Sequence, residues 1–196
     1  MFLSARQQNF ILKFPKGFFY KEIEDRYLPL INRLPVVYET IEDYINSSVQ
    51  KVQFNGFSVE NVEQYLNEDR VKWKQGPRIG NTMNKEFTVS FKLFESYLNY
   101  WILYEQFILF YNYENKDEFL PDVKLFFLDN TGHVTLSFNF QQVLFNEISE
   151  LTLTHEFYSG AIPDLQSFDC KFSFNYFNIE SYIAKDKLFK KYGLGQ

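Results

Sequence analysis

The chain has 196 residues, a length typical of one domain, with 20 basic and 25 acidic residues and a net charge of −5. This balance excludes a basic nucleic-acid binder, and a single cysteine excludes an internal disulfide framework and indicates a reducing compartment. Residues 1–10 hold no apolar run of signal-peptide length, so we expect a protein not exported by a cleaved signal. The most apolar stretch, 97–111, is shorter than the roughly 20 residues that cross a bilayer, so we expect no membrane contact.

The first quarter of the chain predicts two strands separated by a helical segment. Residues 9–14 predict a short strand, and residues 49–54 predict the next one. Residues 16–48, between them, hold two prolines and two helix-like stretches, 21–28 and 40–46. We interpret 16–48 as an insertion packed on the outside of a β core.

A polar region follows the second strand. Residues 59–66 predict another extended piece, and 67–85 predict a long loop or a long hairpin arm. Basic and aromatic residues interleave in this arm at Arg70, Trp73 and Arg78. Such a pattern binds nucleic acid or an acidic patch of a partner, or else lies on a solvated loop. In an oligomer these three residues would form a clamp between subunits.

Three segments alternate between apolar and polar residues, which predicts antiparallel strands with one buried and one wet face. They are 85–92, 134–140 and 168–177. The apolar face of the last one is Phe168, Cys170, Phe172, Phe174 and Tyr176. The wet faces lack the usual catalytic groups and so indicate a lining or a surface. Their candidate residues are Thr88, Ser90, Thr135, Ser137, Asn139, Asp169, Lys171, Ser173 and Asn175.

Two hairpins are predicted in the second half of the chain. Residues 122–128 and 133–140 flank a good turn sequence, and 151–157 are predicted to pair with 168–177. Residues 181–196 form a basic tail that predicts either an amphipathic helix or a mobile end. The fold class is therefore mainly β (α+β), an antiparallel β-sandwich or half-barrel with one main helix.

That main helix is predicted over residues 95–113. Its polar residues Glu95, Asn99 and Gln106 fall within one narrow stripe, and the rest of its circumference is apolar. Such a helix needs cover on more than one side, so we expect the core on one side and a neighbouring subunit on another. The alternative is a helix buried wholly inside its own fold. The candidate interface residues are Tyr97, Trp101, Tyr104, Phe107, Ile108 and Tyr111.

No catalytic or metal-binding pattern is present in the sequence. The predicted strands separate His133 from His155, and with one cysteine these cannot make a typical zinc set. The glycines of 76–80 lack the Lys-Ser/Thr of a phosphate loop. We expect Cys170 to be a small buried hydrophobe. The acidic clusters predicted as solvated faces are Glu22, Glu24 and Asp25, and Glu39, Glu42 and Asp43. We therefore expect no enzyme activity and no cofactor.

The order of elements and two stretches of sequence resemble the tail tube proteins of contractile-tailed bacteriophages. Residues 145–153, followed by 166–176, are similar to the family's ending, where a loop leads into an alternating closing strand. Residues 85–107 resemble the family's strand that runs into its helix. The resemblance covers residues 9–14 and 49–178, and the chain departs from the family in the proposed insertion and in the tail.

The resemblance implies a single tube-like domain over residues 1–180. Subunits of this family form hexameric rings that stack into a hollow tail tube, in a virion assembled in the bacterial host cytoplasm. The wet strand faces would line a lumen through which DNA passes without specific binding, and other tail or baseplate proteins would be partners. The alternatives are a tube initiator, a terminator or a baseplate adaptor of the same fold, or the inner tube of a contractile injection or secretion system. A ligand-binding β-barrel is a more distant alternative.

Overall fold

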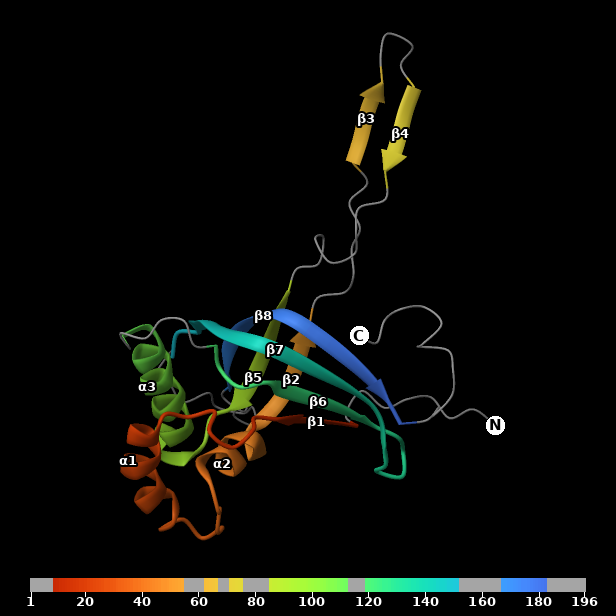
Figure 1. The fold of residues 1–196 in the computed structure, drawn as a ribbon. Coiled ribbons are helices and arrows are strands. Elements are labelled where there is room, and N and C mark those ends of the chain that lie inside the picture. Colours follow the sequence, from red (N-terminus) through yellow and green to blue (C-terminus); the bar gives the residue numbers. More distant parts are fainter. Residues whose placement is uncertain are drawn as a thin grey trace, which may run out of the picture.

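The computed structural model describes residues 9–54, 62–66, 71–75, 85–112, 119–151 and 167–182 (Figure 1). Its main body is a six-stranded antiparallel sheet with the order β1-β6-β7-β8-β5-β2. The strands are β1 (Phe10–Lys13), β2 (Val49–Phe54), β5 (Glu86–Lys92), β6 (Val123–Leu128), β7 (Val134–Ile148) and β8 (Ser167–Ser181). A separate two-stranded sheet pairs β3 (Val62–Leu66) with β4 (Val71–Gln75), so the extended piece predicted over 59–66 forms a hairpin with the first part of the predicted arm, 67–85.

The main sheet curls until strands from its two ends make contact. The Phe54 ring on β2 lies 5.3 Å from the Phe138 ring on β7 and 6.5 Å from the Phe127 ring on β6. In a flat sheet, the four strand steps from β2 to β6 would separate such rings by about 19 Å. The ring contacts therefore require a half-barrel, and the predicted fold class is confirmed.

Phenylalanine rings fill the inside of this half-barrel. Phe87 on β5 stacks on Phe140 of β7 at 4.5 Å and on Phe172 of β8 at 5.2 Å. Burying one such side chain contributes about 1.5–3 kcal/mol, so these rings dominate the stability of the sheet. The apolar faces predicted for β5 and for the first half of β8 are confirmed. Their buried residues are Phe87, Val89, Phe91, Phe168, Cys170, Phe172 and Phe174.

Three α-helices gather at one end of the sheet (Figure 1). They are α1 (Lys21–Ile31), α2 (Ile41–Ser47) and α3 (Leu98–Asn112). Thr40 caps α2 by accepting the Asp43 amide N–H at 3.2 Å. The two helices predicted within 16–48 are confirmed, although α1 continues past Pro29, as its buried face extends to Ile31. In the part of the chain that the structure describes, no helix has the length and apolar character needed to cross a membrane.

The start of the main helix differs from the prediction. A 3-10 turn, η2 (Glu95–Tyr97), precedes α3, and Ser96 and Tyr97 have positive φ values of 67° and 57°. The Asn99 side chain accepts the Phe94 amide N–H at 3.1 Å and donates to the Lys92 carbonyl at 2.7 Å. These two bonds hold the turn against the end of β5, so the regular helix begins only at Leu98.

The long strand β7 and its neighbour overturn the second predicted hairpin. The partners of β8 are β7 and β5, so the predicted pairing of 168–177 with 151–157 is wrong for the described part of β8. Residues 152–157 lie outside the described residues. The strand β7 continues well past Phe140, to Ile148, and takes the place that the prediction gave to 151–157. Gln142 interrupts the alternation with a φ of 54°, which hides this continuation from a pattern search.

The apolar face of β8 changes sides at the same level as that of β7. Tyr176, predicted on the apolar face, lies opposite Gln141 and is 62% exposed. Phe177 packs against the core instead, with its ring 6.2 Å from that of Phe174. The prediction is wrong at Tyr176 because it assumed that strict alternation runs through the whole segment.

Two amide side chains tie the helices to residues 14–20. The Asn46 amide accepts the Phe14 N–H at 2.9 Å and donates to the Phe14 carbonyl at 3.3 Å. The Gln106 amide accepts the Tyr20 N–H at 3.1 Å and donates to the Phe18 carbonyl at 3.0 Å. Each amide therefore satisfies one backbone donor and one backbone acceptor in a stretch that has no strand partner there.

Replacing the fully buried Gln106 tests this attachment. Gln106→Met keeps the volume but leaves the Tyr20 N–H and the Phe18 carbonyl without partners, at about 1–3 kcal/mol each. We expect the free energy of unfolding, measured by urea denaturation, to fall by about 2–6 kcal/mol. Gln50→Met, at an exposed position on β2, is the control and should change it by less than about 0.5 kcal/mol. Equal stability of the two variants would contradict the attachment.

Candidate assembly surfaces

The described residues bring together no catalytic or metal-binding cluster. His133 lies on the exposed β6–β7 turn, with Nδ1 2.8 Å from Thr131 Oγ1. His155 lies outside the described residues. Within the described ranges, no three His, Cys, Asp or Glu side chains are placed to hold a metal ion. Cys170 is fully buried, as predicted, and burial raises the pKa of its thiol well above its usual value, which disfavours the reactive thiolate.

A polar surface covers the outer side of β5 and β8. The strand register places Ser90 opposite Asp169 and Thr88 opposite Lys171. Lys171 Nζ lies 3.5 Å from Glu86 Oε2, so a carboxylate on the same face balances its charge. Because both partners are partly exposed, this ion pair contributes little to stability. The surface is hydrated and close to neutral.

This polar surface continues onto β7 through side-chain hydrogen bonds. Ser173 Oγ donates to Asn146 Oδ1 at 3.1 Å, and Asn175 Nδ2 donates to Gln142 Oε1 at 3.0 Å. The short side chains therefore bond to one another across neighbouring strands, which leaves few strong donors or charges free to bind a ligand.

The predicted polar residues near the start of β7 have different surroundings. Thr135 Oγ1 donates to the Phe127 carbonyl at 3.1 Å, and Asn139 Nδ2 lies 3.4 Å from an Asp122 carboxylate oxygen. Ser137 is only 2% exposed in the single chain. All the other predicted lining residues are partly or fully exposed.

Exposed apolar side chains form a stripe along α3. The α3 stripe consists of Trp101, Tyr104, Ile108 and Tyr111 on α3 and Tyr97 on the preceding turn η2, each between 37% and 48% exposed. The four residues on α3 are three, four and three residues apart, which is the spacing of the a and d positions in a coiled coil. The stripe therefore has the pattern of a surface that packs against another element.

Two polar residues of α3 are buried while several of its aromatic residues are exposed. Asn99 and Gln106 are fully buried, the reverse of the usual arrangement in a surface helix. In the part of the chain that the structure describes, the helix is therefore not buried wholly inside its own fold. Phe107, also predicted at the interface, packs its ring 5.2 Å from that of Phe145 and is only partly exposed. Tyr111 donates its hydroxyl to the Phe145 carbonyl at 2.7 Å, which fixes the end of the stripe.

The predicted clamp of the hairpin arm lies mostly outside the described residues. Arg70 and Arg78 fall there, and Trp73 lies in β4 with Gln64 opposite it in β3. A role of these three residues in subunit contact stays a prediction.

One acidic residue predicted on a solvated face is buried. Glu42 is only 2% exposed, and its Oε1 accepts the Gly17 N–H at 2.8 Å. Gly17 has a φ of 80°, which a glycine adopts without strain. Burial, followed by the charges of Glu42 and Asp25, raises the pKa of Glu24, and Lys21 partly offsets this. No local pattern in the sequence indicates that Glu42 binds Gly17, because the two residues are 25 positions apart.

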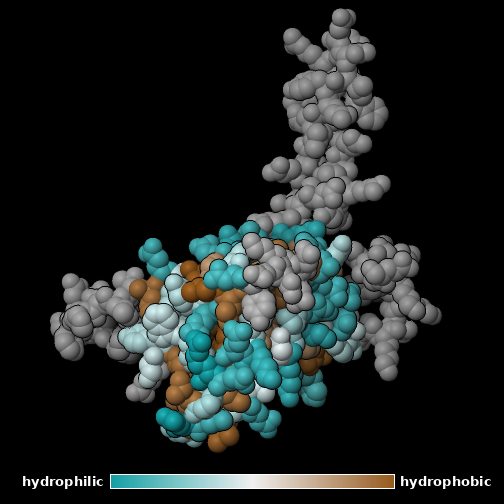
Figure 2. All heavy atoms as spheres, turned by 60° about the vertical axis from the view of Figure 1, so that its left-hand side comes forward, coloured by the Kyte–Doolittle hydropathy of each residue, from teal (hydrophilic) through white to brown (hydrophobic). Residues whose placement is uncertain are grey.

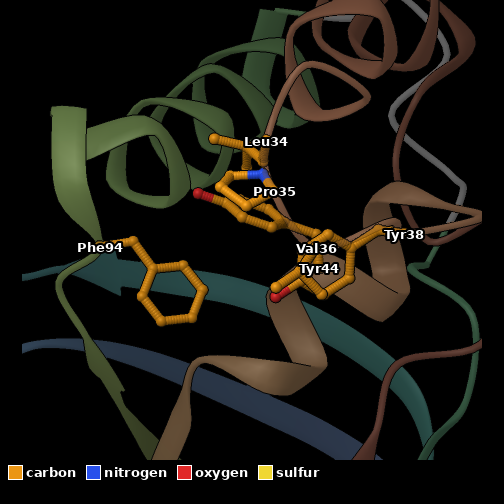
Figure 3. A pocket seen from close by; sticks show the side chains of 6 residues that line it. All are labelled: Leu34, Pro35, Val36, Tyr38, Tyr44 and Phe94. Carbon is orange, nitrogen blue, oxygen red and sulfur yellow. The ribbon is translucent and has the colours of Figure 1, made fainter.

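A small apolar pocket lies beside α2 (Figure 3). It has a cavity volume of about 210 Å³ and is lined by Leu34, Pro35, Val36, Tyr38, Tyr44 and Phe94. This is smaller than the roughly 300–1,000 Å³ of typical ligand sites, and it lies outside the barrel interior. No sequence pattern predicted a pocket in this segment. The available signal was its two consecutive valines, of which Val36 is 58% exposed and Val37 is 84% exposed.

No protein-family model matches the chain, and no curated protein sequence matches it. Solved structures do. A chain of an extracellular contractile injection system, in the PVC sheath–tube complex in its extended state, matches with a TM-score of 0.54 at 9% identity, over 91% of this chain and 92% of that one. A chain of the anti-feeding prophage cap, a tube terminating cap, matches with a TM-score of 0.53 at 9% identity, over 92% and 93%.

A third solved structure extends this set. A chain of the anti-feeding prophage baseplate, 6-fold symmetrised, matches with a TM-score of 0.50 at 10% identity, covering 92% of this chain and 98% of that one. Nearly the whole of each chain takes part in these matches. The chain therefore has the fold that components of contractile injection systems share, which is also the fold that the tail tube resemblance implied.

Alkaline titration tests the burial of Tyr44 beside the pocket. Burial, with a smaller contribution from Tyr38, raises the pKa of Tyr44 from 10.0 to about 12. As the pH rises above 10, the unfolded state loses the Tyr44 proton before the folded state does. The stability that depends on the protonated Tyr44 is therefore complete below pH 10 and is lost as the pH rises toward 12. We expect the urea midpoint of the wild type to fall as the pH rises above 10, and the midpoint of Tyr44→Phe to fall less steeply. Tyr176→Phe, which removes a mostly solvated phenol, is the control, and equal slopes for wild type and Tyr44→Phe would contradict this burial.

Proposed function

We propose that the chain is a structural subunit that assembles into rings, which stack into the tube of a contractile tail or injection particle. The observation that carries this proposal is that the curled sheet ends in two edge strands, β1 and β2. No strand of the described ranges pairs with the outer side of either. An open edge is a template for a strand of another chain, and ring closure removes such edges.

The two edges differ in sequence, which favours a ring over a two-fold dimer. If β1 of one copy meets β2 of the next, the contact is heterologous, and repeating it closes a ring when the rotation fits. The sheets of neighbouring copies then join into one large barrel. We propose six copies, and the likeness to a chain of a 6-fold symmetrised baseplate supports this number.

The polar surface of β5, β7 and β8 would line the lumen of this tube. Its residues are Thr88, Ser90, Thr135, Asn139, Asp169, Lys171, Ser173 and Asn175, whereas Ser137 is buried and is not part of this lining. A neutral, hydrated lining suits passage of DNA without specific binding, because phosphate binding depends on an excess of lysine and arginine. This role requires no chemistry and no cofactor.

A single ring of the same fold is the second candidate function. The likenesses to chains of a tube terminating cap and of a baseplate favour an initiator, terminator or baseplate adaptor as much as a repeating tube subunit. A tube subunit forms long rods, whereas an adaptor or cap stops at one ring. A ligand-binding barrel has less support, because the pocket described above is small and lies at the surface.

Negative-stain electron microscopy of the concentrated protein tests the proposal. We expect rings about one subunit thick or hollow rods, and the length of the rods separates tube from adaptor. The ring proposal would be contradicted if microscopy and sedimentation velocity found only monomers at all concentrations.

An edge variant tests how the rings form. Ile11 is 50% exposed on the edge strand β1, and Lys13 lies two residues further on the same side. Ile11→Lys places a second charge there, a device that blocks edge pairing, and we expect a tenfold or greater loss of rings. Tyr176→Lys, an exposed position in the middle of the sheet, is the matched control and should still form rings. Rings of normal yield from Ile11→Lys would contradict edge-to-edge assembly through β1.

A further inference from the structure

The α3 stripe leaves an apolar surface that lacks a cover in the described part of the chain. Its five exposed residues lie on the helical end of the molecule, where Figure 2 shows brown and pale side chains among teal ones. Trp101 packs edge-on against Tyr104 with ring centroids 5.7 Å apart, so the stripe is a preformed ridge of rings. Heptad spacing favours a helix as the element that covers it.

The charges around the stripe favour a basic partner. Residues 16–48 and 95–112, which make up the helical end, hold eight acidic and four basic residues, and the acidic excess remains when the buried Glu42 and the Arg26–Glu105 pair are left out. Arg26 is already engaged, since its Nη1 lies 2.7 Å from Glu105 Oε2 beside the stripe. Burial raises the pKa of the Tyr100 phenol, and the charge of Glu150 makes a smaller contribution in the same direction. An apolar helix with flanking lysines would therefore complement this surface in both shape and charge.

One segment of this same chain has that composition. Residues 183–196 hold four lysines against one aspartate, and lie outside the described residues. Their large apolar residues Leu188, Phe189 and Tyr192 are spaced for one side of a helix. We propose that residues 183–196 of a second copy cover the α3 stripe. This inference rests on the proposed assembly of copies and adds the contact that joins one ring to the next.

The position of β8 favours a tail that comes from another copy. The strand starts beside α3, where the Phe168 and Tyr100 rings are 5.1 Å apart. It ends at the opposite side of the sheet, where the Tyr182 N–H donates to the Thr135 carbonyl (Figure 1). A 15-residue strand spans about 50 Å, whereas 14 residues of helix span about 21 Å. If the tail is helical, it is too short to return to its own α3, whereas the helical end of a copy stacked beyond the end of β8 would lie within its reach.

Photocrosslinking in mixed isotopes tests this contact on the full chain. Trp101→p-benzoylphenylalanine places the crosslinker in the middle of the stripe, and equal amounts of unlabelled and ¹⁵N-labelled protein are assembled together before irradiation. We expect mass spectrometry to find peptides that join position 101 of one isotope to 183–196 of the other. Val36→p-benzoylphenylalanine, at a 58% exposed position of the helical end outside the stripe, is the matched control and should give at least tenfold fewer such peptides.

A charge variant separates this contact from the ring proposal. Replacing three tail lysines, as Lys187→Glu, Lys190→Glu and Lys191→Glu together, should lower the yield of these crosslinks at least tenfold while single rings persist in electron micrographs. Rings without any crosslink from position 101 to the tail would overturn the inference and leave the ring proposal standing. Crosslinks only within one isotope would overturn the second copy as the source. Absence of both rings and crosslinks would overturn the inference and the proposed function together.

Discussion

The curvature of the main sheet determines where every other surface of the molecule lies. It is held by the aromatic interior, in which Phe54 from one edge of the sheet reaches Phe138 near the other. Because these rings turn the apolar faces of the strands inward, the polar side chains of β5 and β8 must face outward, and the two edge strands, β1 and β2, do not pair with each other. A flat sheet with the same alternation would expose its aromatic face and would have no defined outer lining.

The helical end depends on hydrogen bonds from amide side chains more than on helix propensity. Asn46, Asn99 and Gln106 each bond one backbone donor and one backbone acceptor where a strand or turn has ended. Each such group would cost about 1–3 kcal/mol if left unpaired in the interior. Because Asn99 and Gln106 point into the interior, the opposite side of α3, with its exposed aromatic residues, faces solvent. The exposed stripe is thus a consequence of how the helix is attached.

The parts of the fold that the sequence predicted are those with a regular local period. The alternation in 85–92 and in 168–174 placed buried and exposed faces correctly, because each side chain's environment there follows from its neighbours two positions away. The predictions fail where a residue distant in the sequence determines the surroundings of a side chain. Gln106 bonds Tyr20, 86 residues away, and Glu42 bonds Gly17, 25 residues away. No local pattern indicates such bonds. Glu42 was therefore expected on a solvated face, and Gln106 was assigned only to the polar stripe of the helix.

The surfaces that stay open explain why this fold suits assembly. The five large apolar residues of the α3 stripe and the two strand edges could each form further contacts that the single chain does not make. Burying one such side chain contributes about 1.5–3 kcal/mol, and the cost of ordering a partner consumes part of it, so one contact alone is weak. In a closed ring each subunit makes its contacts on two sides at once, and the effective concentration of the second contact is high because the first has formed. Individually weak contacts of this kind let subunits exchange until the ring is complete, after which simultaneous contacts hold it.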